Sequence, residues 1–349
     1  MHILVANFIF QLVLGLFCIT KTKVKFFVFV SCAVLIYLRT FVDIYSVPDL
    51  EPYSWGYEQM LNINFFEIPE ANIYDVKISE IGFRYLMKIC SLLSSSFTFF
   101  LFIYALLWVG GYWDVIRKYS PNVVLSLLLL IVGSFDQSIF VIRQHLAMVV
   151  VFLSYKYIIE KKSFMYFFMI ALAFSLHQTA IIALPIYFLY HVRGKRRTFL
   201  LIIAIAIFLY FSFSILLNNV GNEMLQGYSL YINSDLQTNS TGAILVAFEL
   251  VFYIFTLKRD VFKDGINKVL FLSLVLGLVL SICGIGFNPT SRLVMYYTSV
   301  SFLTVPIIAS YTKNTLLRNI IIVVFVLLNA YVSYYGSGFD SFRDFKLAI

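Results

Sequence analysis

The sequence has few charged residues and few helix-breaking residues for its length. Only 13% of its 349 residues are charged and only 7 are proline, whereas 61% are hydrophobic. So little polar surface cannot coat a soluble globule, because long apolar segments would remain in contact with water. The composition therefore excludes a soluble globular domain and indicates an integral membrane protein.

Cysteine is also scarce, and its spacing carries no metal or redox motif. The four cysteines are far apart and form no CxxC pair, so we expect neither a metal site nor a disulfide framework. No G-x-x-x-x-G-K-[ST] motif occurs, which leaves an ATP-driven transporter without support. The net charge of +8 reflects membrane topology and not a nucleic-acid surface. The sequence therefore predicts no cofactor, no metal and no nucleic-acid partner.

Apolar runs recur along the whole chain and predict an all-α, polytopic membrane protein. A helix needs roughly 20 apolar residues to cross the hydrocarbon, and a helix satisfies its own backbone in lipid. We expect a single membrane domain over residues 1–349 with about twelve transmembrane helices. The expected spans are 2–20, 25–43, 94–113, 121–135, 139–159, 163–176, 178–192, 198–217, 243–257, 269–286, 292–311 and 319–335. Residues 80–93 are expected to form an interfacial or re-entrant helix.

Lysine and arginine concentrate in alternate breaks between these runs, as at Lys161 and Lys162. By the positive-inside rule, these short basic breaks face the cytoplasm. Lysines follow the first run and do not precede it, so this run is expected to stay in place with its N-terminus outside. Two larger loops, about 44–79 and 218–242, then lie on the outer side. We therefore expect function to face outward.

Four arginines on the predicted outer side lie beside apolar runs: Arg39, Arg84, Arg143 and Arg292. An arginine near the bilayer centre costs about 2.5–3.5 kcal/mol, and less where it reaches the interface. Each of the four could be an anchor on lipid phosphate. Together they could instead supply a set of donors for a phosphate or pyrophosphate group. We expect them to converge on one outward-opening cationic site.

A helix-breaking histidine and an outer glutamate are candidates for acid–base chemistry. His177 is followed by Gln178, with Pro185 further on, which indicates a break that lines a cavity. Its imidazole could take a proton from a sugar hydroxyl, bind phosphate, or be hydrogen-bonded within the bundle. Glu80 is expected at the start of a membrane-proximal helix with Ser79 as its N-cap, either as a base or as a charge favoured by the helix dipole.

Several short motifs occur in a definite order over roughly the first 190 residues. The second apolar run ends at an arginine, and an acidic, tyrosine-rich outer loop follows. An S-E-x-G-[FY] step, an I-R-Q-x-x-A motif and the helix-breaking histidine come next. The residues concerned are Arg39, Asp49, Tyr53, Ser79, Glu80, Gly82, Phe83, Ile142, Arg143, Gln144, Ala147 and His177. This order resembles the EpsG/Wzy-type family of bacterial polysaccharide polymerases.

The resemblance implies a glycosyltransferase that acts on undecaprenyl-pyrophosphate-linked oligosaccharides at the periplasmic face of the bacterial inner membrane. The growing glycan would move from its carrier onto a lipid-linked repeat unit, with release of lipid pyrophosphate. His177 or Glu80 would be the base, and Arg143 would stabilise the departing group. The residues expected to bind pyrophosphate or glycan are Arg39, Arg84, Arg292, Asp49, Tyr53 and Gln144. Membrane lipids, a flippase and a chain-length regulator of the same pathway are the implied partners.

Other functions would use similar residues. A flippase for lipid-linked oligosaccharides also needs cations within the membrane, but it should show an internal repeat and a deep basic path, and the sequence shows neither. A ligase or another carrier-dependent glycosyltransferase would use the same donor chemistry. A membrane acyltransferase needs only a histidine at the membrane surface, although its companion motifs are not evident.

Overall fold

In a computed structural model, the protein is described over residues 3–18, 21–69, 80–192, 197, 200–202, 204–205, 207–208, 240–283, 290–336 and 345–348. These ranges are almost entirely helical, as the sequence predicted, and hold no strand apart from a single antiparallel bridge between Val42 and Leu347. The expected span at 198–217 and the expected outer loop at 218–242 lie largely outside the described residues.

The described helices follow one another with short connections. They are α1 Ile3–Phe17, α2 Lys21–Thr40, α3 Leu50–Asn62, α4 Ile81–Leu93, α5 Phe97–Tyr119, α6 Val123–Leu130, α7 Asp136–Phe140, α8 Ile142–Ile159, α9 Ser163–Leu176, α10 Leu184–His191, α13 Ser240–Leu257, α14 Ile266–Cys283, α15 Thr290–Thr298, α16 Ser301–Tyr311 and α17 Thr315–Gly336. A π-helix, η1 Ile131–Phe135, joins α6 to α7, and two 3-10 helices, η2 Gln178–Ala183 and η4 Lys258–Phe262, follow α9 and α13.

Six helical segments within the described ranges are long and apolar enough to cross a membrane. They are Phe97–Tyr119, Val123–Phe140, Ile142–Ile159, Ile266–Cys283, Arg292–Tyr311 and Thr315–Ser333. Helices α1 and α9 are apolar but shorter than a full crossing. The structure thus confirms a helical architecture with spanning segments and does not confirm about twelve of them.

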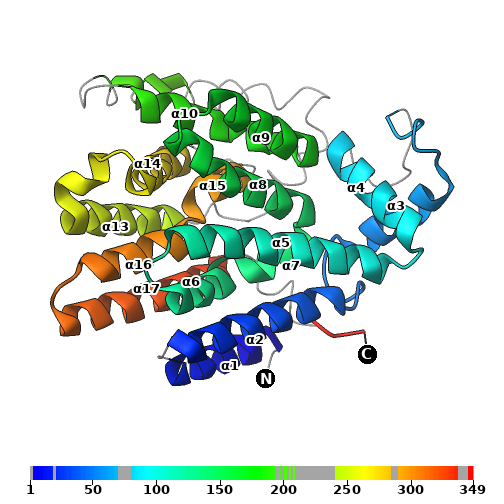
Figure 1. The fold of residues 1–349 in the computed structure, drawn as a ribbon, viewed down its shortest axis with the longest axis horizontal. Helices are drawn as coiled ribbons and strands as arrows, with labels where there is room; N and C mark the ends of the chain where they lie inside the picture. Colours follow the sequence, from blue (N-terminus) through cyan, green and yellow to red (C-terminus); the bar gives the residue numbers. More distant parts are fainter. Residues whose placement is uncertain are drawn as a thin grey trace.

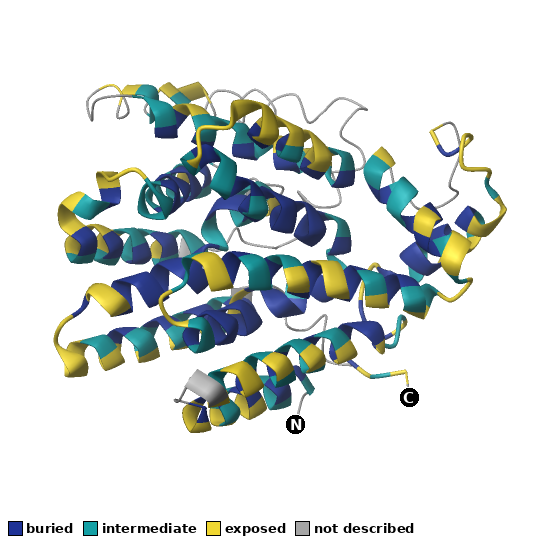
Figure 2. Ribbon diagram, in the orientation of Figure 1, coloured by how far each residue is buried: buried dark blue, intermediate teal, exposed yellow. Residues whose placement is uncertain are grey.

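Helix α5 runs through the centre of the molecule, with α2 and α6 on one side and α8 on another (Figure 1). Its buried face repeats every four residues, at Phe100, Tyr104, Trp108 and Tyr112, which is the spacing of one helix face. The outer helices reverse this pattern, since Phe29, Phe164 and Leu327 are large, apolar and exposed. Figure 2 shows such exposed faces turned outward, as a lipid-facing surface requires.

The predicted outer loop at 44–79 is partly helical. It contains α3, which packs against α4 at one end of α5 (Figure 1). Lys88 Nζ donates to the carbonyl of Met60 at 2.8 Å, and Tyr57 Oη donates to the carbonyl of Ser94 at 2.7 Å. Helix α4 has the extent predicted for an interfacial or re-entrant helix, but its N-cap is Glu80 and not Ser79. The glutamate therefore stands just before the first helical turn and is free to point away from the helix axis.

Two helices are interrupted beside the candidate site. The segment 123–140 passes through the π-helix η1, and the chain then leaves helical geometry at Val141 before α8 begins at Ile142. The break predicted at His177 is confirmed, because α9 ends at Leu176 and the 3-10 helix η2 begins at Gln178. Interrupted helices expose backbone and polar side chains inside a bundle, and they are frequent at functional sites.

Candidate active site

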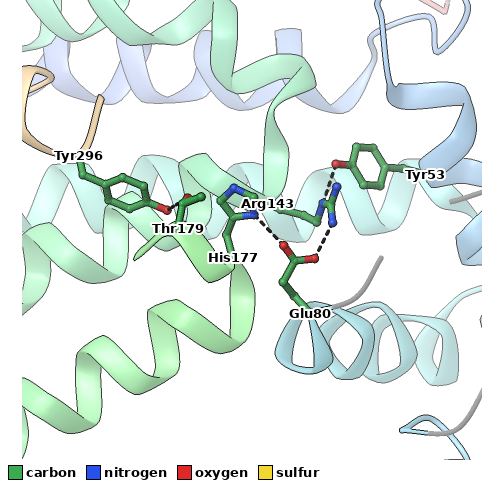
Figure 3. A network of polar contacts seen from close by, with 6 residues as sticks. All are labelled: Tyr53, Glu80, Arg143, His177, Thr179 and Tyr296. Carbon is green, nitrogen blue, oxygen red and sulfur yellow. Dashed lines mark hydrogen bonds and ion pairs between the residues drawn. The ribbon is translucent and has the colours of Figure 1, made fainter. Parts of the chain in front are cut away.

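A buried carboxylate, Glu80, lies at the centre of the candidate site. Its side chain is 4% exposed. One carboxylate oxygen accepts a hydrogen bond from Arg143 Nη1 at 2.5 Å, and the other lies 2.8 Å from His177 Nδ1. Figure 3 shows both side chains turned toward this carboxylate from separate helices. Three residues that are distant in sequence therefore form one ion-paired cluster at the start of α4, the start of α8 and the end of α9.

The surroundings of Glu80 determine its protonation state. Burial raises the pKa of this carboxyl group, but the hydrogen bond from His177 and the charge of Arg143 outweigh burial and hold the pKa at about 2. The carboxylate is thus ionised at neutral pH. The stability that it contributes is present above the ordinary carboxyl pKa and is lost only as the pH falls toward 2.

An ionised carboxylate fixes the tautomer of His177. Because the carboxylate of Glu80 can only accept hydrogen bonds, Nδ1 of His177 must be the donor. The other ring nitrogen, Nε2, is buried and has no hydrogen-bond partner among the described residues. In the neutral imidazole this nitrogen carries the lone pair, so the pair presents an oriented base of the carboxylate–histidine type.

The chain around His177 is held on both sides of the break. The backbone N–H of His177 donates to Ala173 at 2.9 Å, while His177 itself is extended. Beyond the break, Thr179 Oγ1 donates to Tyr296 Oη at 3.3 Å (Figure 3), and Tyr297 Oη donates to the carbonyl of Ile182. Both tyrosines belong to α15 and are buried. Packing of α15 against η2 therefore fixes the direction of the imidazole.

Arg143 is held by two groups. Its Nε donates to Tyr53 Oη at 2.8 Å and its Nη1 to Glu80. Tyr53 comes from α3, is 6% exposed, and packs edge-on against Phe83 of α4. Burial raises the pKa of Tyr53, against the opposing effect of the Arg143 charge, so the phenol stays neutral. The Arg143 side chain is 21% exposed, which leaves the guanidinium near the surface of the site.

Gly82 explains how Glu80 reaches His177. A Cβ at this position would lie 2.8 Å from the carbonyl oxygen of Ser175 in α9, closer than real Cβ atoms approach backbone. The absence of a side chain lets the first turn of α4 pack directly on the last turn of α9. This contact brings the S-E-x-G motif to the histidine.

We expect Gly82→Ala to reduce activity about ten- to hundred-fold, because the added methyl group must push α4 away from α9 and lengthen the Glu80–His177 contact. The measurement is polymer formed per folded, membrane-inserted molecule. Gly110→Ala is the matched control, because its Cβ would meet no atom within 4 Å. Full activity of Gly82→Ala would show that close packing at this glycine is not required.

Gln144 and Arg292 are linked, although not as the sequence suggested. Gln144 is fully buried, and its Nε2 donates to the backbone carbonyl of Arg292 at 2.6 Å. The Arg292 side chain is exposed at the start of α15. Gln144 therefore joins α8 to α15, which also holds the histidine break, and it does not present its amide to a substrate.

Three further residues expected in the site lie outside the cluster. Arg84 donates from Nη1 to the carbonyl of Ile68 at 3.2 Å, in the turn after α3. Asp49 is exposed and precedes α3 in a left-handed conformation. Arg39 is 1% exposed and stacks 3.5 Å from the ring centroid of Trp108. The structure thus brings one of the four arginines to the Glu80–His177 pair and does not form the single cationic site that was expected.

Sequence analysis did not identify the aromatic residues that surround Arg39. Trp108 and Tyr104 lie in an uninterrupted apolar run, so their types match an ordinary buried helix face. It also missed η1, because nothing in IVGSF distinguishes a π-helix from an α-helix. A deeply buried arginine beside Asp136 was the available signal, since a buried charge needs compensation.

Comparison with known proteins supports the motif order. A sequence model of the EpsG family matches residues 23–345, which includes the whole cluster. The chain belongs to the EpsG family. Searches of curated proteins and of solved structures each found no match. EpsG-family membership, together with the apolar helices, establishes a membrane protein with a role of the polysaccharide-polymerase type.

Proposed function

We propose that this EpsG-family protein is a polymerase that extends a polysaccharide on a lipid carrier. It would transfer the growing glycan from undecaprenyl pyrophosphate to a lipid-linked repeat unit at the periplasmic face of the bacterial inner membrane. The observation that carries this proposal is the Glu80–His177–Arg143 cluster, in which an oriented imidazole and a guanidinium share one buried carboxylate. Neither residue pair is required by helix packing alone.

The chemistry follows from the charges of the cluster. His177 Nε2 accepts the proton of the acceptor sugar hydroxyl, whose oxygen then bonds to the anomeric carbon of the donor. The bond between that carbon and the pyrophosphate oxygen breaks, and lipid pyrophosphate leaves with the electron pair. Before transfer the formal charges of Arg143, Glu80 and neutral His177 sum to zero. After proton transfer the cluster carries one positive charge, which stabilises the developing negative charge on the pyrophosphate.

The surroundings suit a lipid-linked substrate. The site lies where α4 packs against α9 and beside the start of α8, at the end that the positive-inside rule assigns to the outer side. Exposed apolar residues of α4, Ile89, Leu92 and Leu93, lie on the same short helix. A carrier embedded in the bilayer can therefore bring its pyrophosphate to the cluster without leaving the membrane.

Deletion of the gene, followed by electrophoresis of lipid-linked glycans, tests the proposed function. Loss of a polymerase should remove the ladder of long chains and leave single repeat units at the outer face. Repeat units trapped at the cytoplasmic face would instead identify a flippase. Complementation with the wild-type chain should restore the ladder in full, and a ladder unchanged by deletion would exclude the polymerase.

The partners proposed for this protein follow from the same reaction. They are undecaprenyl-pyrophosphate-linked oligosaccharides, the surrounding lipids, and a flippase and chain-length regulator that act before and with a polymerase. The same deletion strain tests them, because a polymerase that depends on a regulator changes the chain-length distribution, and not the yield of single units, when the regulator is removed.

A further inference from the structure

Arg39 lies in an aromatic enclosure within the helix bundle. Its guanidinium carbon is 3.5 Å from the ring centroid of Trp108, 4.6 Å from that of Phe135 and 5.8 Å from that of Tyr104. The residue is 1% exposed. A planar guanidinium stacks on aromatic faces with favourable electrostatics. At this depth, the side chain cannot meet a substrate without rearrangement of α5.

Few hydrogen bonds hold the buried charge. Arg39 Nη2 lies 3.5 Å from the carbonyl oxygen of Phe135, longer than the usual 2.7–3.2 Å, and Nε and Nη1 have no partner among the described residues. Asp136, also buried, supplies the nearby negative charge. Stacking and the field of Asp136 therefore hold Arg39, and both act on the same short stretch of chain.

That stretch leads directly to the candidate site. Phe135 is the last residue of η1, where α-helical hydrogen bonding is interrupted, and its carbonyl also accepts from Ser138 Oγ. Tyr104 Oη donates to the carbonyl of Ser138 at 2.6 Å. Helix α7 ends at Phe140, and Arg143 follows in the first turn of α8. The position of α7 thus determines where Arg143 starts.

We propose that Arg39 is a positioning residue: by stacking on Phe135 and pairing with Asp136 it holds η1 and α7 in place, and thereby sets Arg143 against Glu80. This inference rests on the proposed function for its kinetic consequences. It assigns Arg39 a role different from the carrier binding that the sequence suggested. The energetic cost of burying the charge is offset by the helix interruption that it stabilises.

A kinetic double-mutant cycle tests the inference. Arg39→Met keeps a long side chain for the aromatic enclosure but removes the charge and the planar group. It should lower kcat about ten- to hundred-fold at unchanged KM for the lipid-linked repeat unit, because binding groups remain. In an Arg143→Lys background it should lower kcat by less than about threefold, since the residue it positions is already impaired. Rates are expressed per folded molecule.

Several results would overturn it. Multiplicative effects in the cycle, a raised KM at constant kcat, or full activity per folded Arg39→Met molecule each contradict positioning through Arg143. Arg39→Lys serves if the methionine variant does not fold, because it keeps the charge and loses only the stacked plane. It should retain more activity than Arg39→Met and show the same non-additivity.

Amide hydrogen exchange gives a readout that does not require polymerisation. Arg39→Met should speed exchange at least tenfold in peptides covering 135–145, while peptides of α9 keep the wild-type rate. Unchanged exchange in 135–145 would refute the coupling. If the wild-type protein makes no polymer, the proposed function fails, yet this exchange experiment still decides whether Arg39 holds α7.

Discussion

His177→Ala is expected to abolish polysaccharide chain growth while leaving membrane insertion and yield unchanged. The physical reason is the loss of Nε2, the nitrogen that takes the acceptor proton in the proposed reaction. General-base catalysis typically contributes about 10²–10⁴ in rate, so the long-chain ladder should disappear and single repeat units should accumulate. The measurement is electrophoresis of lipid-linked glycans from cells with equal amounts of each variant.

Two further variants separate the roles of this histidine. His177→Gln can still donate to Glu80 through its side-chain amide but cannot carry a proton, so it should be as inactive as His177→Ala. His191→Ala is the matched control, because His191 lies in α10, where its Nδ1 is 2.8 Å from the carbonyl of Tyr187. Normal polymer from His177→Ala would eliminate the base. Activity of His177→Gln would leave the histidine as a partner for Glu80 only.

The pH dependence assigns the base further. The carboxyl pKa of Glu80 is about 2, so Glu80 remains ionised throughout the near-neutral range and does not change charge there. A fall in activity below neutral pH must therefore come from another group, and in this cluster that group is the imidazole. The same low pKa makes Glu80 a weak base, which favours His177 over Glu80 among the two candidates that the sequence left open.

Arg143→Lys is expected to lower polymerisation by about 10²–10³, close to the effect of Arg143→Ala. Lysine keeps the positive charge but cannot donate to Tyr53 and Glu80 at the same time with a rigid planar group. The alanine variant also removes the charge partner of a buried carboxylate and should lower stability by about 3 kcal/mol. Polymer ladders and thermal unfolding of the purified variants measure the two effects.

Arg117→Lys is the matched control for Arg143→Lys. Arg117 is exposed, lies in the last turn of α5 and pairs with Asp114 on the same helix. Exposed pairs of this type contribute little to stability, so both ladder and melting temperature should stay at wild-type values. An unchanged ladder in Arg143→Lys and in Arg143→Ala would remove Arg143 from the reaction and leave the cationic half of the proposal without support.

Local signals explain what was predictable. The break at His177 could be expected because a histidine, polar neighbours and Pro185 interrupt an apolar run, and such signals act within a few residues. The short helix after Glu80 was predictable for the same reason. The choice of Glu80, Arg143, His177 and Tyr53 came from motif order. Their mutual contacts did not, because Glu80 and His177 are separated by 97 positions.

The arginines show the limit of reading one dimension. Arg39 and Arg143 each adjoin apolar sequence on the same predicted side, so composition and topology treat them alike. Arg143 meets a carboxylate from α4, whereas Arg39 meets the aromatic face of α5 and a π-helix. Which of these environments an arginine enters depends on helix rotation and crossing, and a single sequence specifies those only through the packing of the whole bundle.

The sequence by itself determined the helical membrane architecture, the break at His177 and the family, because hydropathy, helix breakers and motif order are local properties of the chain. Only the tertiary structure decided that Glu80 joins His177 to Arg143, that Gly82 permits this approach, and that Arg39 is enclosed away from the cluster. The physical reason is that a buried carboxylate acquires its protonation state and its partners from side chains on other helices, and these are neighbours only after folding.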